Sequence, residues 1–401
     1  MLRSPSIRII FVALIAGLVS VACAPGPSLV PPLTGAVQLD ARWDHACVVT
    51  TGGAVKCWGP DRGGSLGNIP LDILGGTSSN VALDVSSISG ATQVAGGADF
   101  TCAVLFDGHV KCWGRNLYGQ LGDGTNSNSN VAVEVSGIAD ATQVSASGAG
   151  ACALVGGGAV KCWGYNYVGE LGNGTFVEGA PYGSNTPVDV TGLSGATQVS
   201  AAADHACALM SDGSAKCWGN NASGELGNGT TAGPSSHPQG STVPVDVSGL
   251  VGATQIVSGG GETCALMAGG TAKCWGSNHF GQLGDGTTSD SNVPVDVSGV
   301  TGATQIEAGF GETCALMAGG TAKCWGFNES GQLGNGTKAN STTPVSVVGL
   351  VGATSLSAGT EGVCAVMAGG TAKCWGRNDL GQLGNGTNTG STTPSTVLQL
   401  S

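Results

Sequence analysis

The chain has 401 residues and is poor in charged and aromatic side chains. Charged residues make up 10% of the sequence and aromatic residues 5%, whereas an average globular domain is about 25% charged. The 14 Lys and Arg are outnumbered by 26 Asp and Glu, which gives a formal net charge of −12. This balance excludes the basic surface with which proteins bind nucleic acid or anionic lipid. It favours solubility and, to a lesser degree, a cationic partner.

The sequence also lacks the motifs of common catalytic sites. It contains no Gly-x-Ser-x-Gly, no His-Glu-x-x-His and no phosphate-binding Gly-Lys-Ser/Thr. Of the five histidines, His45 and His205 share a repeat position, and a structural role is favoured for them over a functional one. The segment 284–290 offers oxygen ligands for calcium, but Asn replaces its Asp in most copies and no 12-residue calcium loop is present. We therefore expect no catalytic residue, no cofactor and no metal.

What the sequence has in abundance is glycine, with 72 residues, and one stretch that recurs seven times. The copy Cys264-Ala-Leu-Met-Ala-Gly-Gly-Thr-Ala-Lys-Cys-Trp-Gly276 shows its features: two cysteines ten residues apart, the second followed by Trp-Gly. An apolar run, a Gly turn and a second run predict a β-hairpin. Counting inward from the cysteines, Ala265 faces Lys273 and Leu266 faces Ala272. In this register the two cysteines lie opposite each other, within reach of disulfide geometry.

The fourteen repeated cysteines predict one disulfide in each hairpin. A zinc site is the competing interpretation, but nine intervening residues are not the close spacing of zinc ligands, and no His recurs with the pairs. A regularly spaced, even set of cysteines in a chain with a secretory leader indicates a disulfide framework. The expected pairs are Cys47–Cys57, Cys102–Cys112, Cys152–Cys162, Cys207–Cys217, Cys264–Cys274, Cys314–Cys324 and Cys364–Cys374.

The N-terminus has the pattern of a signal peptide over residues 1–22. Arg3 and Arg8 precede an apolar core at 9–18, and small residues then lead to Cys23. The segment Val-Ser-Val-Ala-Cys23 resembles a bacterial lipoprotein box, although a Leu is usual where Ser20 stands. We expect Cys23 to be lipidated; ordinary cleavage nearby is the alternative. Residues 23–33 are rich in proline and predict an extended tether. The expected location is therefore extracytoplasmic, either lipid-anchored in the bacterial cell envelope or secreted.

From residue 34 to 401 a unit of about 50 residues recurs. A full unit reads Pro-Val-Asp-Val-Ser-Gly-Leu at 244–250 and Gly-Ala-Thr-Gln-Ile at 252–256, followed by the hairpin and a loop such as 281–287. Four short extended segments at this period predict an all-β fold, a seven-bladed β-propeller with four-stranded blades. The first unit lacks the Pro-Val-Asp-Val strand, and 393–400 supplies one without a hairpin. We therefore expect N- and C-terminal strands to share one blade and close the ring.

The loop Trp275-Gly-Ser-Asn-His-Phe-Gly-Gln-Leu-Gly284 resembles the repeat of the regulator of chromosome condensation family, and the resemblance extends over residues 34–401. It implies a seven-bladed propeller used as a binding platform, and it carries over no catalytic residue. The family includes nuclear guanine-nucleotide exchange factors and secreted bacterial members, among them an inhibitor of β-lactamase. The leader, the paired cysteines, the acidic surface and the absence of a basic tail match the secreted bacterial type rather than the nuclear one.

Features that recur seven times are expected to belong to the scaffold, because a binding site usually breaks the symmetry of its scaffold. A Lys precedes the second cysteine in every copy. These lysines form either an anion-attracting ring or a set of alkyl stems that cover the blades, and the second interpretation is favoured. They are Lys56, Lys111, Lys161, Lys216, Lys273, Lys323 and Lys373.

The repeats differ in three longer loops, at 67–80, 176–186 and 231–243, and in aromatic residues of the loops. Exposed aromatic residues are common anchors of protein interfaces. The alternative is that they pack over the ends of the blades. The candidate partner-binding residues are Tyr118, Tyr165, Tyr167, Phe176, Tyr182, Phe280 and Phe327.

Together these patterns predict an extracytoplasmic module that binds a protein partner through variable loops on a rigid, disulfide-stapled propeller. We expect a monomer that binds no nucleic acid and contacts a membrane through a lipid at Cys23 alone. Three alternatives remain open. They are an exchange-factor-like regulator, by family resemblance, a surface lyase or hydrolase with its site at the channel mouth, and a purely structural envelope protein.

Overall fold

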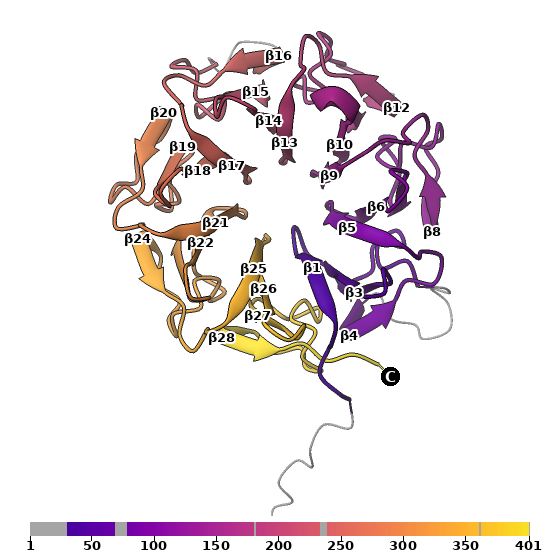
Figure 1. Cartoon of the computed structure of the whole chain (residues 1–401), viewed down its shortest axis with the longest axis vertical. Coiled ribbons are helices and arrows are strands. Elements are labelled where there is room, and N and C mark those ends of the chain that lie inside the picture. The colour runs from indigo at the N-terminus through magenta and orange to yellow at the C-terminus, as the bar shows by residue number, and fades with distance from the viewer. Residues whose placement is uncertain (1–29, 69–77, 180–181, 233–238, 361, 401) are drawn as a thin grey trace, which may run out of the picture.

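A computed structural model describes residues 30–68, 78–179, 182–232, 239–360 and 362–400. These residues form seven four-stranded antiparallel sheets arranged in a ring (Figure 1), and residues of several sheets line a channel at its centre. The sheets are the blades of a β-propeller, which confirms the predicted fold class. Within the described ranges the single helical element is the short 3-10 helix η1 (Gly156–Gly158). We number the blades 1 to 7 in chain order.

Each blade is built from four consecutive strands, ordered from the centre of the ring outward (Figure 1). The innermost strands are β1 (Ala36–Asp40), β5 (Ala91–Gly96), β9 (Gln143–Ala146), β13 (Ala196–Ala201), β17 (Ala253–Ser258), β21 (Ala303–Ala308) and β25 (Ala353–Ala358). The second strands are β2 (Ala46–Thr50), β6 (Phe100–Leu105), β10 (Gly150–Val155), β14 (His205–Met210), β18 (Glu262–Met267), β22 (Glu312–Met317) and β26 (Gly362–Met367).

The third and fourth strands complete each blade on its outer side. The third strands are β3 (Val55–Pro60), β7 (Val110–Gly114), β11 (Ala159–Tyr165), β15 (Ala215–Asn220), β19 (Ala272–Gly276), β23 (Ala322–Gly326) and β27 (Ala372–Gly376). The outermost strands are β4 (Ser78–Asp84), β8 (Ser129–Glu134), β12 (Gly183–Asp189), β16 (Gly240–Asp246), β20 (Ser291–Asp296), β24 (Ser341–Ser346) and β28 (Ser391–Thr396).

The second and third strands form the predicted cysteine hairpin in the predicted register. In blade 5, Cys264 lies opposite Cys274 and Ala265 opposite Lys273. Gly270 turns the chain with φ +79°, a conformation that Gly adopts without steric cost. All seven expected disulfides are present, with Cα–Cα distances of 4.0–4.1 Å. A bridge across so short a loop stabilises the fold by roughly 2–3 kcal/mol.

The hydrophobic core is divided into seven clusters, one between each pair of neighbouring blades. Between blades 5 and 6, the Cys264–Cys274 disulfide and Leu283 pack with Trp325. The Trp325 indole Nε1 donates a hydrogen bond of 2.8 Å to the carbonyl oxygen of Gln282. Gly284 (φ +69°) lies against this ring, where a Cβ would come within 2.6 Å of Nε1. The Gly-Gln-Leu-Gly loop of one blade and the Trp-Gly of the next are therefore the two halves of one joint.

Every Trp of a Trp-Gly pair makes the corresponding bond to the preceding blade. The joint thus runs through the whole ring, including the seam where blade 7 meets blade 1. The tryptophans are Trp58, Trp113, Trp163, Trp218, Trp275, Trp325 and Trp375.

A second joint is made by the Gln of the innermost strands. The Gln255 side chain accepts a hydrogen bond from the Ile306 backbone N and donates one to the Ile306 oxygen, both 2.8 Å long. In blade 7 Ser355 stands where the other blades have Gln, so the seam lacks this joint.

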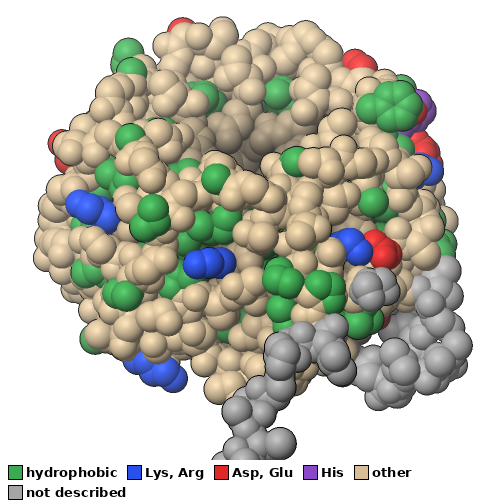
Figure 2. All heavy atoms as spheres, turned by 60° about the horizontal axis from the view of Figure 1, so that its bottom comes forward, with side chains coloured by type: hydrophobic (Ala, Val, Ile, Leu, Met, Phe, Trp, Pro, Cys, Tyr) green, Lys and Arg blue, Asp and Glu red, His purple; other side chains and the backbone are tan. Residues whose placement is uncertain are grey.

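The neighbouring Thr residues, such as Thr254, donate to backbone oxygens within their own blade. These Thr and Gln residues line a wide channel of about 1120 Å³. The hollow in Figure 2 is lined mainly by backbone and by side chains that are neither hydrophobic nor charged.

The ring closes in a different way from the one predicted. We expected N- and C-terminal strands to share one blade, but β1–β4 and β25–β28 form two separate blades of consecutive strands. A periodic sequence does not show where a blade begins, and each blade begins at the Ala-Thr-Gln strand rather than at Pro-Val-Asp-Val. The two ends of the chain still meet at the seam. Pro32 pairs with Leu398, and Ala82 of β4 pairs with Gln399.

Five of the seven repeated lysines lie beside acidic residues of the outermost strands, whereas Lys323 and Lys373 stand opposite Ser346 and Thr396. Lys273 Nζ lies 2.6 Å from Asp296 Oδ1, and Lys56, Lys111, Lys161 and Lys216 have acidic partners in the same place. They do not form a ring of uncompensated positive charge, in agreement with the favoured scaffold interpretation.

Some predictions concern residues that the structure does not describe. The signal peptide at 1–22, Cys23 and most of the tether lie outside the described residues, and these remain predictions. Within the part of the chain that is described, no helix is long and apolar enough to cross a membrane.

Candidate protein-binding face

The direction of the strands places the most variable loops at one end of the channel. The first and third strands of a blade run in the same direction because each is antiparallel to the second. The loops that follow them therefore emerge at the same end, which we call the loop face. The hairpin turns lie at the opposite end. All seven predicted partner-binding residues lie at the end of a third strand or in the loop that follows it, and so on the loop face.

A buried Asn holds each of these third-to-fourth loops in a fixed shape. In blade 5, Asn278 Oδ1 accepts a hydrogen bond of 2.9 Å from Leu283 N, and its Nδ2 lies 3.1 Å from Thr287 Oγ1. The Asn two residues after Trp-Gly has the same function in five other blades: Asn116, Asn166, Asn221, Asn328 and Asn378. Side chains next to this Asn therefore project from a rigid loop.

The structure brings all four tyrosines of the chain together on the loop face. Tyr118 comes from blade 2, and Tyr165, Tyr167 and Tyr182 come from blade 3. The Tyr165 ring is central, with centroids 5.0 Å from Tyr118, 6.2 Å from Tyr167 and 6.3 Å from Tyr182. Tyr167 and Tyr182 are 37% and 39% exposed. We call these four residues the tyrosine cluster. Its residues were predicted individually, and the fold joins them into one surface.

The phenylalanines among the candidates lie elsewhere on the same face. Phe280 of blade 5 and Phe327 of blade 6 form a pair with ring centroids 4.8 Å apart. Gly311 lies against this pair, since a Cβ there would come within 3.1 Å of the Phe280 ring. Phe176 is partly exposed on the loop between β11 and β12. The predicted residues therefore include two aromatic groups, on either side of blade 4.

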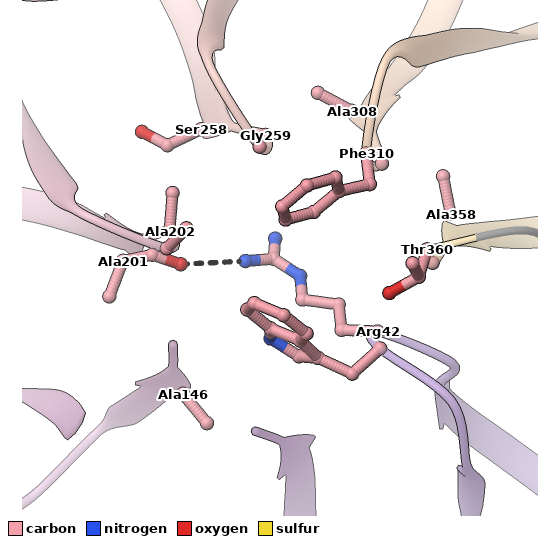
Figure 3. A pocket seen from close by; sticks show the side chains of 15 residues that line it. Arg42, Ala146, Ala201, Ala202, Ser258, Gly259, Ala308, Phe310, Ala358 and Thr360 are labelled. Carbon is pink, nitrogen blue, oxygen red and sulfur yellow. Dashed lines mark hydrogen bonds between the residues drawn. The ribbon is translucent and has the colours of Figure 1, made fainter. Parts of the chain in front are cut away.

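Three residues at the centre of the loop face were not among the predictions: Arg42, Trp43 and Phe310. The Trp43 and Phe310 rings lie 5.4 Å apart. Figure 3 shows Arg42 reaching across the mouth of the channel beside Phe310, and its Nη1 donates a hydrogen bond of 3.1 Å to the Ala201 oxygen. Arg42 thereby connects blade 1 to blade 4 and narrows this end of the channel.

Two carboxyl groups, of the partly buried Asp40 and the buried Glu307, lie close to Arg42. Its guanidinium is 3.9 Å from both Asp40 and Glu307. Burial raises the pKa of Glu307 to about 7, although Arg42 opposes the shift.

Trp43 has φ +61°, and no other non-glycine residue in the described ranges has a positive φ. Such a conformation costs of order 1–3 kcal/mol and persists only where surrounding contacts fix it.

The sequence did contain a signal for Trp43 and Phe310 at the centre of the loop face. Trp43 is the one tryptophan of eight that is not followed by Gly, and it stands where the other blades have Ala, Gly, Thr or Phe. Phe310 shares the same repeat position. A search for residues that interrupt the repeat would have found both, whereas the search for loop aromatics after Trp-Gly passed over them.

The two histidines that share a repeat position are structural, as favoured from the sequence. His45 Nε2 lies 2.7 Å from Thr101 Oγ1 of the next blade, and His205 Nε2 lies 2.8 Å from Thr263 Oγ1. Both imidazoles are buried, and the loss of hydration lowers each pKa to about 4. They are therefore neutral hydrogen-bonding groups between blades.

Comparison with protein families identifies the repeat. A family model described as the regulator of chromosome condensation (RCC1) repeat matches more than half of the chain, at 107–154, 158–209, 212–266, 271–316 and 321–366. The chain belongs to this family. A second model of the RCC1 repeat matches 91–120, 196–225, 253–282 and 303–332. RCC1 repeat proteins typically act by binding, in agreement with the prediction that the chain is not an enzyme.

Solved structures of similar proteins share the propeller. Human WBSCR16 is 24% identical with a TM-score of 0.74, and the match covers 86% of this chain and 93% of that one. Prp20p from Saccharomyces cerevisiae is 21% identical with a TM-score of 0.72, and the match covers 91% of this chain and 87% of that one. At these identities the likeness shows the RCC1-type fold alone.

Proposed function

We propose that the protein is an extracytoplasmic binding module that holds a protein partner on its loop face. The observation that carries this proposal is the tyrosine cluster. Tyrosines dominate the energy of many protein interfaces because their large rings bury apolar area while the hydroxyl group forms hydrogen bonds. Here four of them lie together, partly exposed, on loops fixed by buried Asn residues.

The scaffold suits this use because it presents the loops in a nearly fixed arrangement. One disulfide in each blade and the Trp and Gln joints between blades restrict movement of the loop bases. A surface ordered before binding loses less conformational entropy when the partner docks. Seven disulfides also point to an oxidising environment outside the cytoplasm.

The similar structures support a protein partner. Prp20p binds Gsp1p and histones, and a second structure of the same yeast protein contains it bound to Kap60. The exchange-factor alternative fits this chain less well, since the disulfides indicate an oxidising compartment whereas GTP is held in the cytoplasm.

The proposal is tested by crosslinking and mass spectrometry in the native host. The wild-type chain is compared with the Tyr165→Ala/Tyr167→Ala variant, and with Phe106→Ala as a matched control. Phe106 is 80% exposed in the turn between β6 and β7, on the opposite face. We expect the wild type and Phe106→Ala to capture the same partner, and the double variant to bind it at least about 30-fold more weakly. Capture that is equal in all three would show that the tyrosine cluster is not the binding surface.

A further inference from the structure

Three aspartates occupy one repeat position on the loop face, three residues before the first cysteine of their hairpins. Two of them are paired with arginines of the same chain. Asp44 Oδ2 accepts a hydrogen bond of 3.2 Å from Arg62, and Asp99 Oδ2 accepts one of 2.9 Å from Arg115. In blades 1 and 2, therefore, this position is an arginine-binding carboxylate. The third aspartate is Asp204 in blade 4.

Asp204 has the same backbone setting as Asp99 but lacks the arginine. Arg115 N donates to the Asp99 backbone oxygen at 2.9 Å, and Asn220 N donates to the Asp204 backbone oxygen at 2.8 Å. Asn220 thus stands where Arg115 stands in blade 2. Its side-chain Nδ2 lies 3.2 Å from Glu225 and makes no bond to the Asp204 carboxylate. Among the described residues, no ion pair or side-chain hydrogen bond reaches the Asp204 carboxylate, and Asp204 is exposed.

The surroundings of Asp204 add negative charge rather than compensate it. Glu170 and Glu225 stand where four other blades have Gln. Burial raises the pKa of Glu170 to about 7 and also that of Glu225, and the charge of Asp204 contributes to both shifts. The Glu170 Oε1 atom is buried without a hydrogen-bond partner in the structure. The region around Asp204 therefore contains three carboxyl groups, and within the described residues none of them is paired with a cation.

The tyrosine cluster reaches the segment that carries Asp204, because Tyr165 and Glu170 of blade 3 line one small cavity with Ala202 and His205 of blade 4. The pKa of Tyr165 is raised mainly by burial, and the charges of Glu170 and Asp204 add to the shift. An aromatic face next to a carboxylate favours a guanidinium group, which can stack on the ring while its planar fork binds the carboxylate. An ammonium group is a more strongly hydrated point charge and fits this pair of contacts less well.

We propose that Asp204 and Tyr165 form a subsite for an arginine side chain of the protein partner. The guanidinium of the partner binds the Asp204 carboxylate as the Arg115 guanidinium binds the Asp99 carboxylate. The inference rests on the proposed function, since it names the chemistry of the partner that the loop face binds. The net charge of −12 additionally favours the approach of a basic partner.

The subsite is tested with short peptides on the full-length, disulfide-bonded chain. The probes are acetyl-Gly-Arg-Gly-amide and the same peptide with citrulline, which has the shape of arginine without its charge. Binding is followed by NMR of labelled tyrosine rings. We expect saturable shifts of the Tyr165 signals with the arginine peptide and none with citrulline. Asp204→Asn is expected to weaken arginine binding about tenfold or more.

Two further variants use the repeat as an internal control. Asn220→Arg supplies the missing arginine within the chain, as in blade 2, and is expected to abolish binding of the peptide. Asp99→Asn changes the same repeat position where an arginine is already present, and is expected to leave binding unchanged. Equal binding of citrulline, an absence of saturable binding, or unchanged binding by Asp204→Asn would each overturn the proposal. Thermal unfolding checks that each variant is folded.

Failure of this inference is separable from failure of the proposed function. The crosslinking experiment is repeated with Asn220→Arg. If this variant captures the partner as the wild type does while Tyr165→Ala/Tyr167→Ala loses it, the loop face binds the partner but the arginine subsite is wrong. Loss of capture in both variants supports the subsite.

Discussion

The two ends of the central channel are built from the same seven repeats, yet their residues differ in how strictly they recur. At the end with the hairpin turns, Thr and Gln line the channel in nearly every blade. Gln255 and its equivalents are hydrogen-bonded to the next blade. At the loop face, Trp43 of blade 1 corresponds to Gly260 of blade 5 and Phe310 of blade 6. Residues that recur are engaged in holding the blades together, whereas side chains available to a partner occur where the repeat is interrupted.

The largest expected effect separates the two kinds of tryptophan. Trp275→Ala removes a fully buried ring from the joint between blades 4 and 5, and we expect the free energy of unfolding to fall by about 3–5 kcal/mol. Trp43→Ala removes a partly exposed ring at the loop face, and we expect a loss of about 1 kcal/mol or less. Urea unfolding with the disulfides intact measures both. A larger loss for Trp43→Ala than for Trp275→Ala would mean that the residues at the centre of the loop face, and not the Trp joints between blades, stabilise the ring.

A second prediction concerns Glu262, which shares the repeat position of His45 and His205 and is completely buried. Burial raises its carboxyl pKa from 4.5 to about 8. Because the folded-state pKa lies above the unfolded value, its contribution to stability is fully present below about pH 4.5 and is lost as the pH rises through about 8. The amide of the Glu262→Gln variant does not ionise, so this variant does not lose stability in the same way as the pH rises. We expect the variant to be more stable than the wild type above about pH 8, by on the order of 3 kcal/mol, and similar at about pH 5.

The control for Glu262→Gln is Glu329→Gln, since Glu329 is exposed on the loop face. Urea unfolding midpoints at the two pH values should differ little between this control and the wild type. If Glu262→Gln follows the wild type at both values, the buried carboxyl does not contribute to the pH dependence of stability.

The smallest effect tests the repeated end of the channel. Gln255→Ala removes two hydrogen bonds to Ile306 and is expected to lower the free energy of unfolding by about 1–2 kcal/mol. Ser355→Gln introduces the missing Gln at the seam and is expected to raise it by about 1 kcal/mol. Urea unfolding again measures both changes. A destabilised Ser355→Gln variant would show that the seam does not have the geometry of the other joints.

The hairpins and their disulfides could be predicted because they depend on local geometry. Cys264 and Cys274 are ten residues apart around a Gly turn, so the register of a single hairpin brings them together. Where each blade begins could not be predicted, because a periodic sequence is compatible with any starting strand. The predicted shared blade was wrong for this reason, while the contact of the two chain ends at Pro32 and Leu398 is real.

The candidate site was predicted in part. The exposed loop aromatics were found from the sequence, because each follows Trp-Gly or lies in an insertion. Their grouping could not be found, because the contact of Tyr118 with Tyr165 depends on how blade 2 packs against blade 3. The pairing of Asp44 and Asp99 with arginines, and its absence at Asp204, likewise depends on side chains from two different loops.

The sequence alone determined the period, the hairpins, the disulfides and the propeller, because these follow from short-range spacing repeated seven times. Tertiary structure decided which residues meet on the loop face and which charges have partners, because those contacts join different loops and, in the tyrosine cluster, neighbouring blades. The hydrogen bond from Arg42 to Ala201 across the channel is a further example, since nothing local in the sequence relates blade 1 to blade 4.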